Sequence, residues 1–219
     1  MKSQKPKNLK KLRRYTDLSE AIYILSKNKL SLHKPSLWDD KNDSFFIKQY
    51  KSKCKFKSVL VLCFSGAKET YHHWKIYASG PAGICIEFKF DSLCDDIDKY
   101  KNKAGVLIKK KVTYMRIDKQ EESLPIKDKK DLPFTKRKAF KDEKEYRIIY
   151  ASKENKPHLD IDLSPTTISR IILSPWLPKS RVENMKENLK DIGRHFKLEI
   201  KRSSLLNNEQ WKKIAVDTT

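Results

Sequence analysis

Cysteine is scarce in this sequence, and its spacing matches no metal or redox motif. The four cysteines are Cys54, Cys63, Cys85 and Cys94, and no two of them form a C-x-x-C pair. Cys63 and Cys85 lie in apolar, strand-like runs, which favours buried free thiols in a reducing cytosol over disulfides or zinc ligands. The adjacent His72 and His73 have no cysteine near them in the sequence, so no metal site is expected there.

Long apolar segments and internal repeats are also missing from the 219 residues. No run is long enough to span a membrane, and the basic Met1–Lys11 segment lacks the apolar centre of a signal peptide. We therefore expect a cytoplasmic protein without a membrane partner. The length suits one domain, which we place at residues 12–202. A basic arm is expected at 1–11, a loop or insertion at 116–133 and a tail at 203–219.

Acidic residues are outnumbered in this chain. Forty-nine lysines and arginines face 28 aspartates and glutamates, which gives a formal charge of +21 and a pI near 9.7. This charge exceeds what solubility needs, and a positive field attracts polyanions such as nucleic acid. A lysine-rich proteome would raise the lysine content without such a purpose, and the individual lysine runs fit solvated faces. Only the summed charge argues for a nucleic-acid partner.

Hydrophobic alternation and apolar runs predict more strands than helices. Strands are expected at Leu12–Thr16, Leu30–Leu32, Ser58–Phe64, Ile84–Phe90, Val106–Tyr114, Tyr146–Tyr150, Ile168–Leu173 and Phe196–Ile200. Helices are expected at Asp17–Lys27, at Thr70–Tyr77, weakly at Ser92–Tyr100, and from a cap at Ser180 to Gly193. Because the helices fall early and late, the predicted fold class is α+β: a twisted, mostly antiparallel sheet with helices packed outside.

Two local patterns define the first helix and the segment that follows its return strand. Asp17 and Glu20, three residues apart, form a capping-box pattern. The apolar residues after Asp17 then repeat at helical spacing: Leu18, Ala21, Ile22 and Leu25. Pro35–Ser44 is rich in serine, aspartate and asparagine around Trp38, so we expect a loop there.

The stretch Lys141–Tyr150 changes from continuous charge to a strand pattern of aromatic and β-branched residues. If the strand begins early, Glu143, Glu145 and Arg147 share one face, since side chains alternate along a strand. Two carboxylates at the mouth of a buried strand lose solvation and repel each other. A basic side chain, a metal or a cationic substrate must then compensate them. The simpler alternative is a solvated strand end with Arg147 paired to a glutamate.

Three segments, in this order, resemble the ADP-ribosyltransferase superfamily: Arg14-Tyr15-Thr16 ending the first strand, Phe64-Ser65 ending a central strand, and Glu143-Lys144-Glu145 entering a later strand. The opening is most similar to the His-x-Thr opening of DarT-type DNA-modifying toxins and of tRNA phosphotransferases, with no histidine at that position here. Residues 10–195 also resemble a large uncharacterised bacterial domain family. That similarity lies in the series Arg-Tyr-Thr, Phe-Ser, Trp-x-x-Tyr, Gly-Ile-Cys-Ile-Glu-Phe and Glu-x-Glu-Tyr-Arg-Ile.

The resemblance implies transfer of ADP-ribose from NAD, which breaks the nicotinamide–ribose bond through an oxocarbenium-like state. It implies that Glu145 stabilises this cation and binds the ribose 2′-hydroxyl, while Glu143 orients or deprotonates the acceptor. Arg14 would pair with the dinucleotide phosphate or ribose, or would grip the adenosine ribose together with Thr16. Ser65 would support the ribose or Glu145.

One aromatic residue is also implied to stack on nicotinamide: Tyr15, Trp74 or Tyr77. Taken singly, each of these three fits a place in the hydrophobic core better than a place in a binding site, because aromatic residues dominate cores. If the resemblance holds, the strands that end near Thr16, Ser65 and Glu145 converge on one cleft. The site would need NAD and no metal.

The resemblance further implies a bacterial toxin or phage-defence effector, with an antitoxin or regulatory protein as a partner. RNA, DNA and protein all remain open as acceptors, and the charge of +21 favours nucleic acid. A metal-dependent nuclease is one rival, because Asp142-Glu143-Lys144 resembles the acidic-x-Lys element of such enzymes, with Asp131 or Asp142 as a further ligand. A basic nucleic-acid-binding module without catalysis is the other rival.

Overall fold

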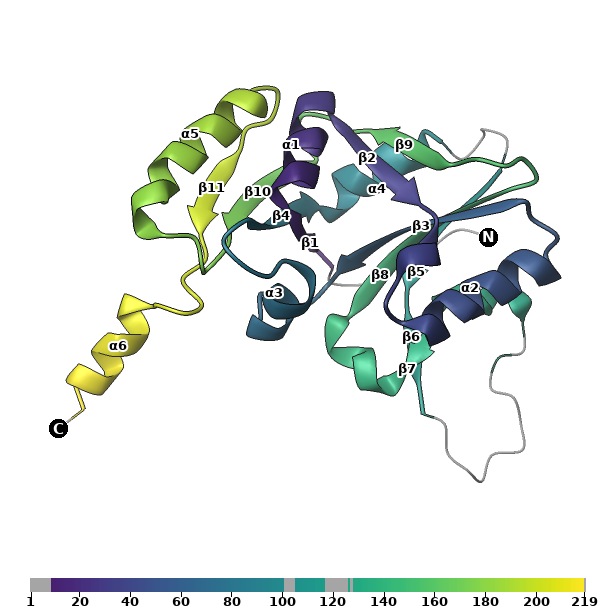
Figure 1. Cartoon of the computed structure of the whole chain (residues 1–219), viewed down its shortest axis with the longest axis horizontal. Coiled ribbons are helices and arrows are strands. Elements are labelled where there is room, and N and C mark those ends of the chain that lie inside the picture. The colour runs from purple at the N-terminus through teal and green to yellow at the C-terminus, as the bar shows by residue number, and fades with distance from the viewer. Residues whose placement is uncertain (1–8, 101–104, 117–125, 127, 219) are drawn as a thin grey trace.

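The chain folds around one large sheet (Figure 1), seen in a computed structural model that describes residues 9–100, 105–116, 126 and 128–218. In this part of the chain, nine strands form the large sheet, two form a small parallel pair, and helices pack outside. The α+β class with a mostly antiparallel sheet is therefore confirmed. Most of the expected arm at 1–11 and of the expected loop at 116–133 lies outside the described residues.

The strands of the large sheet are β1 (Lys11–Asp17), β2 (Lys29–His33), β3 (Ser58–Ser65), β4 (Gly83–Lys89), β5 (Val106–Lys111), β8 (Glu145–Ser152), β9 (His158–Asp162), β10 (Ile168–Leu173) and β11 (Glu199–Arg202). Neighbouring strands are antiparallel except β10 and β11. The small sheet pairs β6 (Thr113–Met115) with β7 (Thr135–Arg137). Apolar runs such as that of β3 form strands buried on both faces, as the sequence predicts.

The large sheet divides at β3. This strand pairs with β8 along its whole length, and Ser65 at its end lies opposite Glu145. On the other side of β3, one residue pair joins it to β1, Arg13 opposite Ser65, and one pair joins it to β2. β1 and β3 therefore stay together only at this point. Beyond this point β1 and β3 are no longer paired, and the three strands that meet here, β1, β3 and β8, carry candidate functional residues.

Three helices cover one face of the sheet: α1 (Leu18–Lys27), α4 (Phe90–Asp98) and α5 (Val182–Ile192). Their apolar sides form the main core with alternate strand residues, and Ile24 of α1, Leu93 of α4 and Leu189 of α5 are all buried there. Asp17 caps α1, because its carboxylate accepts a hydrogen bond from the backbone N–H of Glu20 (2.9 Å). The capping-box pattern thus marks the correct helix start.

Two helices lie against the opposite face, α2 (Lys41–Lys53) and α3 (Tyr71–Tyr77). α2 packs Ile47 and Tyr50 onto β3 and β8 in a second apolar cluster. α3 packs Trp74 onto Cys85 of β4 in a third cluster. Because strand side chains alternate, the polar residues of β1, β3 and β8 that share this face project toward α2 and α3.

The strand β8 shows this alternation directly. Tyr146 and Ile148 join the main core, while Glu145 and Arg147 lie on the α2 face. The strand begins at Glu145, so Glu143 is not part of it and belongs to a preceding 3₁₀ helix. Between the two glutamates, Lys144 has a left-handed backbone with φ 45°, so the chain turns sharply there.

The expectation of a loop at Pro35–Ser44 is wrong at its end, because α2 begins at Lys41. The Asp40 carboxylate caps this helix by accepting from the backbone N–H groups of Asn42 (3.0 Å) and Asp43 (3.2 Å). Polar residues dominate α2 and few of its side chains are buried, so its apolar repeat is weak. The polar residues that suggested a loop, Asp40 to Ser44, form the N-cap and the first turn of α2.

Three smaller expectations also differ from the structure. Ile22 is 37% exposed, and Ile24 enters the core in its place. α5 starts at Val182 after Arg181, so Ser180 does not cap it. The last strand begins at Glu199 and not at Phe196, because Phe196 belongs to a turn that its N–H closes by a hydrogen bond to the Gly193 carbonyl.

The tail carries a further helix, α6 (Glu209–Val216), which is longer than the single turn expected. Figure 1 shows it at the end of an extended segment, projecting away from the sheet. Trp211 and Ile214 on this helix are exposed. No helix in the described part of the chain has the length and apolar character needed to cross a bilayer.

Candidate active site

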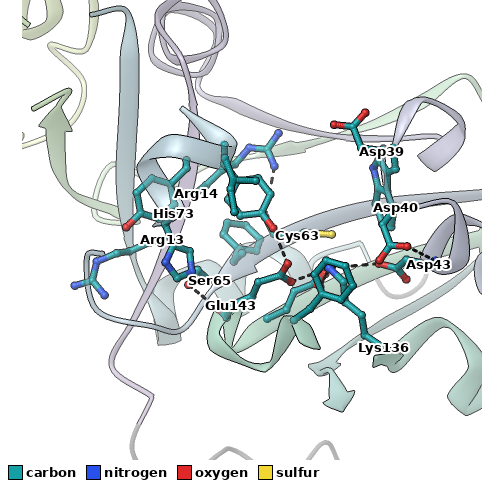
Figure 2. Close-up of a pocket in the computed structure, with 17 residues that line it drawn as sticks. Arg13, Arg14, Asp39, Asp40, Asp43, Cys63, Ser65, His73, Lys136 and Glu143 are labelled. Atoms are coloured by element: carbon teal, nitrogen blue, oxygen red, sulfur yellow. Dashed lines mark hydrogen bonds and ion pairs between the residues drawn. The ribbon is translucent and has the colours of Figure 1, made fainter. Parts of the chain in front are cut away.

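A pocket with a cavity volume of about 440 Å³ lies beside the point where β1 and β3 meet, and we call it the central pocket. Its lining is Arg13, Arg14, Tyr15, Trp38, Asp39, Asp40, Asp43, Cys63, Phe64, Ser65, His73, Ile76, Tyr77, Lys136, Phe140, Glu143 and Glu145. Six of the eight residues that the resemblance singles out are among them: Arg14, Tyr15, Ser65, Tyr77, Glu143 and Glu145. Figure 2 shows the two arginines on one side of the pocket and the three aspartates on the other, with Glu143 between them.

A buried arginine holds Glu145 in place. Arg147 is fully buried, and its Nε and one terminal nitrogen donate to the two carboxylate oxygens of Glu145 (2.7 and 2.9 Å). The same guanidinium donates to both oxygens of Asp43 on α2 (2.8 and 2.6 Å) and to the carbonyl of Pro133 (2.8 Å). All five N–H groups of Arg147 are thus used. A cationic side chain compensates the carboxylates, as one sequence hypothesis requires, and the strand end is buried.

Lys136 supplies the second cation of this cluster. Its ammonium lies 2.7 Å from the Glu143 carboxylate, 3.4 Å from that of Glu145 and 3.7 Å from that of Asp43. The ammonium therefore occupies the space between the three carboxylates, where a shared metal ion would have to sit. In the part of the chain that the structure describes, no group of three or more histidine, cysteine, aspartate or glutamate side chains is arranged to hold a metal.

The environments of the two glutamates push their pKa values in opposite directions. Burial disfavours ionisation of Glu145, but the charge and hydrogen bonds of Arg147, helped by Lys136, outweigh burial and lower the pKa of Glu145. Burial also dominates at Glu143, where Lys136 and a hydrogen bond from Tyr77 compensate only in part, so the pKa of Glu143 is raised. Glu145 is thus a fixed negative charge, and Glu143 is suited to exchanging a proton.

Tyr77 completes the surroundings of Glu143. Its phenol donates to the Glu143 carboxylate (2.6 Å), while its ring is partly exposed at the pocket. Burial and the nearby carboxylate raise the pKa of Tyr77 above its ordinary value, so the phenol stays protonated as a donor. A second phenol, Tyr114, accepts a hydrogen bond from the backbone N–H of Glu145 (2.8 Å). Both glutamates are therefore oriented by neighbours from other elements.

Ser65 serves as a hydrogen-bond junction. Its hydroxyl donates to the backbone carbonyl of Glu143 (2.7 Å) and accepts from the N–H of Ala67 (3.1 Å). The Nε2 of His73 lies 3.2 Å from the same hydroxyl, and its Nδ1 contacts Thr70 (2.5 Å). Since the Ser65 hydrogen is already donated, Nε2 of His73 carries the proton and donates. Burial lowers the pKa of His73, in keeping with a neutral ring.

Arg14 reaches the pocket differently from the other residues. Arg13, Ser65 and Glu145 lie opposite one another in a row across three strands, so they share one face of the sheet, and alternation places Arg14 on the other face. Arg14 lines the pocket nevertheless, with a terminal nitrogen 3.5 Å from the Cys63 carbonyl oxygen on β3. Because β1 and β3 separate beyond their single residue pair, the Arg14 side chain can reach the pocket from the other face of the sheet.

The two arginines are engaged to different degrees. Arg13 donates to the buried Glu87 carboxylate (2.6 Å) and to the carbonyl of Ala67 (2.5 Å), so both of its terminal nitrogens are engaged. Arg14 has a carboxylate only at 3.8 Å, that of Glu20, and its hydrogen bond to the Cys63 carbonyl is long (3.5 Å). The Nε of both arginines is buried without a partner among the described residues, so the difference lies in the terminal nitrogens. Burial lowers the pKa of Arg14, partly offset by Glu20. Arg14 is thus the guanidinium left to meet an anionic ligand.

Thr16 and Trp74 do not line the central pocket. Trp74 is fully buried in the cluster under α3, and its indole N–H donates to Glu69 (2.8 Å). Of the three aromatic residues implied to stack on nicotinamide, Tyr15 and Tyr77 therefore remain. Tyr15 packs its ring on His73 (centroids 5.3 Å apart) and edge-on to Trp74 (5.3 Å).

Sequence reasoning missed six charged or histidine residues of the site: Arg13, Asp39, Asp40, Asp43, His73 and Lys136. Arg13 precedes the motif and differs from Arg14 only in strand face. His73 is visible only as part of a histidine pair, and Asp43 follows the cap of a helix read as a loop. No sequence pattern marks Lys136 among the 49 basic residues.

The sequence comparison finds a family match. A protein-family model described as Protein of unknown function (DUF2971) matches residues 73–148. The matched segment contains Tyr77, Glu143 and Glu145, and so includes the later part of the motif series. No curated protein matches the chain.

Among solved structures, the chain is similar to Thermus sp. 2.9 DarT in complex with ADP-ribosylated ssDNA. The sequence identity is 10% and the TM-score is 0.44. The similarity covers 93% of this chain and 98% of that chain.

Proposed function

We propose that this protein is an NAD-dependent ADP-ribosyltransferase whose acceptor is a nucleic acid. One observation carries the proposal: the central pocket holds two carboxylates with opposite pKa shifts, Glu143 and Glu145, on the far side from the underused guanidinium of Arg14. A cavity of about 440 Å³ is within the size range of small-molecule and cofactor sites. The motif order that resembles the ADP-ribosyltransferase superfamily supports the same reading.

The first step breaks the bond between the ribose C1′ and the nicotinamide nitrogen, and the bonding electrons leave with nicotinamide. Positive charge then develops on the ribose, in a state like that of glycoside cleavage. Glu145 is kept ionised by Arg147 and Lys136, and it is held in one orientation by the hydrogen bonds of Arg147. A preorganised negative charge of this kind stabilises a cationic transition state without reorganising.

The second step joins C1′ to an oxygen or nitrogen of the acceptor, which must lose a proton. Glu143 is the group for this role, because its raised pKa makes it a better base than an ordinary glutamate. Its carboxylate faces the pocket and is fixed by Tyr77 and Lys136. Nicotinamide has left as a neutral molecule, so the positive charge is on the ribose and passes to the acceptor atom that attacks C1′. Transfer of the acceptor proton to Glu143 removes that charge.

Binding of NAD would use the opposite side of the pocket. A guanidinium suits the oxygens of a pyrophosphate, and the terminal nitrogens of Arg14 have donor capacity left for them, because their contacts are long (3.5 Å to the Cys63 carbonyl and 3.8 Å to Glu20). The rings of Tyr15 and Tyr77 line the same pocket and are available for nicotinamide. The charge of +21 then favours a polyanionic acceptor over a neutral one.

The nuclease alternative is weaker for a physical reason. The Lys136 ammonium already lies within 4 Å of the carboxylates of Asp43, Glu143 and Glu145, so a divalent ion there would have to displace it. Of the two further ligands considered, Asp131 pairs with Lys110 at an exposed position (2.6 Å), and Asp142 is exposed and does not line the central pocket.

The decisive experiment is turnover of NAD by the purified protein. We expect nicotinamide release, faster in the presence of RNA or DNA, and a rise in melting temperature with NAD because a ligand of the native state stabilises it. Mg²⁺ alone should produce neither effect. Nucleic-acid cleavage that needs Mg²⁺ and ignores NAD would contradict the proposal and favour the nuclease.

Arg14→Ala tests the assignment of the phosphate side. We expect it to weaken NAD binding about 10- to 100-fold, the equivalent of one charge-assisted hydrogen bond of about 1.5–3 kcal/mol. Isothermal titration of NAD into both proteins measures this. The matched control is Arg194→Ala, an exposed arginine that does not line the pocket, and it should bind NAD like the parent. Equal affinity in Arg14→Ala would place the dinucleotide elsewhere.

A further inference from the structure

The outer side of α2 forms a second pocket, which we call the α2 groove. Its cavity volume is about 490 Å³. Buried Ile47 and Val59 form apolar walls, and Phe45 lines it with 54% of its surface exposed. Four lysines surround this apolar surface: Lys34, Lys41, Lys48 and Lys51. Phe45 is thus a large aromatic side chain held at the surface among cations.

The charge of the α2 groove is of one sign. Its lining contains no aspartate or glutamate. Lys41 donates to the carbonyl of Trp38 (2.8 Å) and Lys34 to the side-chain oxygen of Asn155 (3.3 Å), both neutral groups. Within the described residues, none of the four lysines has a carboxylate partner. The positive charge of the groove is therefore available to an anion.

The helix itself arranges these residues in a stripe. Lys41, Phe45 and Lys48 follow one another at spacings of four and three, which places them on one side of α2. Lys51 continues the stripe one turn further, so the lysines extend along about 15 Å of helix at 1.5 Å per residue. The other side of the same helix carries Asp43 into the central pocket. The outer side of α2 therefore carries the positive charges of the lysines, and the side that faces the central pocket carries the negative charge of Asp43.

We propose that the α2 groove binds a single strand of nucleic acid, with one base stacked on Phe45 and the backbone phosphates beside Lys41, Lys48 and Lys51. Stacking on an exposed aromatic ring and attraction to unpaired lysines are the two interactions by which proteins hold single strands. A duplex keeps its base faces inside its own stack, so it would use only the lysines.

The position of the groove deepens the proposed function and rests on its nucleic-acid acceptor. A helix with its side chains is about 10–12 Å across. A strand anchored on the outer side of α2 therefore presents its neighbouring nucleotides near the central pocket on the inner side. The carboxylates Asp39, Asp40 and Asp43 line the central pocket, and they favour a phosphate path on the lysine side of the helix.

The test measures binding without NAD, so that it is separate from catalysis. Fluorescence anisotropy with a labelled 12-nucleotide ssDNA, the matching ssRNA and the matching duplex would be recorded for the parent, Phe45→Ala and the double variant Lys48→Glu/Lys51→Glu. We expect Phe45→Ala to bind either single strand about 5- to 100-fold more weakly, the range for one lost base stack. The double variant should flatten the salt dependence by about 0.7 per lysine removed.

Matched controls are the exposed Trp211→Ala on α6 and the exposed Lys190→Glu on α5, which should bind like the parent. Melting temperatures confirm that each variant is folded. Parent-like binding by both α2 variants, or an equal effect of Phe45→Ala on duplex and single strand, would overturn the proposal. A preference for RNA or for DNA supports it and identifies the strand.

NAD turnover in water, without any acceptor, separates this proposal from the proposed function. If the α2 variants lose strand binding but still hydrolyse NAD like the parent, both proposals stand. If the parent binds a strand through Phe45 but does not turn over NAD, the α2 groove stands and the proposed function fails.

Discussion

Glu145→Gln is expected to reduce both NAD cleavage and ADP-ribose transfer by a factor on the order of hundreds or more. Removal of one preorganised electrostatic group from a transition state has an effect of this size. The substitution keeps the shape of the side chain and removes the charge that Arg147 and Lys136 hold in the pocket. Nicotinamide release, followed by chromatography under NAD saturation, measures the loss.

Glu143→Gln should separate the two steps. Because Glu143 is assigned to the acceptor, its loss should reduce transfer to nucleic acid more than hydrolysis of NAD by water. The two glutamine variants therefore differ in the ratio of transfer to hydrolysis. Equal losses in both reactions would mean that Glu143 acts on NAD itself.

The matched control is Glu199→Gln. Glu199 is exposed, pairs with Arg170 (2.6 Å) and does not line the central pocket. A surface substitution of this kind changes stability by about half a kcal/mol and should leave activity unchanged. NAD titration and melting curves show whether the Glu145 variant still binds and folds. Full activity in Glu145→Gln would refute the catalytic assignment.

Local patterns were sufficient to predict eight of the nine strands of the large sheet, but not β9, β7 or the order of the strands. The apolar run of β3 and the alternation of β4 and β8 depend on neighbouring residues in the sequence, so they are visible without the fold. The same is true of α1, whose capping residue Asp17 and buried face lie within eleven residues of one another. The α+β class and the mostly antiparallel sheet follow from these elements.

α2 shows why a local pattern can fail. Its first residues, Lys41 to Ser44, are polar and read as a turn, and only Ile47 and Tyr50 provide a buried apolar contact. The helix is held to the sheet partly by Asp43, which pairs with Arg147 104 residues away in the sequence. No periodicity in the segment itself carries that information.

Some residues of the candidate site could likewise be predicted from the sequence, and others could not. Glu143 and Glu145 could be predicted because two close carboxylates before a strand require compensation. Of the two compensating cations, Arg147 lies in the same stretch and could be named as a partner. Lys136 could not, because it arrives from β7 only when the chain folds, as does Asp43 of α2, which shares Arg147 with Glu145. The face of the sheet occupied by Arg14 likewise depends on the register of β1 against β3, which the sequence does not specify.

Arg147→Met is expected to have the largest effect on stability, a loss of about 3–5 kcal/mol, because removing one partner leaves buried charges uncompensated. Glu145 and Asp43 are each only 4% exposed and would both lose their strongest partner. The contacts between β8, α2 and the carbonyl of Pro133 would weaken together. Melting temperature and chemical denaturation measure the loss, which for a chain of this size corresponds to roughly 6–20 °C.

A double-mutant cycle distinguishes lost pairing from lost packing. If Arg147→Met lowers the free energy of unfolding because two buried carboxylates lose their cation, then adding Asp43→Asn should recover part of the loss. The second substitution removes one of these two uncompensated charges. If the cost is the cavity left by a smaller side chain, Asp43→Asn should add a further loss. The exposed Lys212→Met on α6, which breaks an ion pair with Glu209 (3.2 Å), should cost about 1 kcal/mol or less. An unchanged melting temperature in Arg147→Met would show that the buried cluster does not anchor α2 to the sheet.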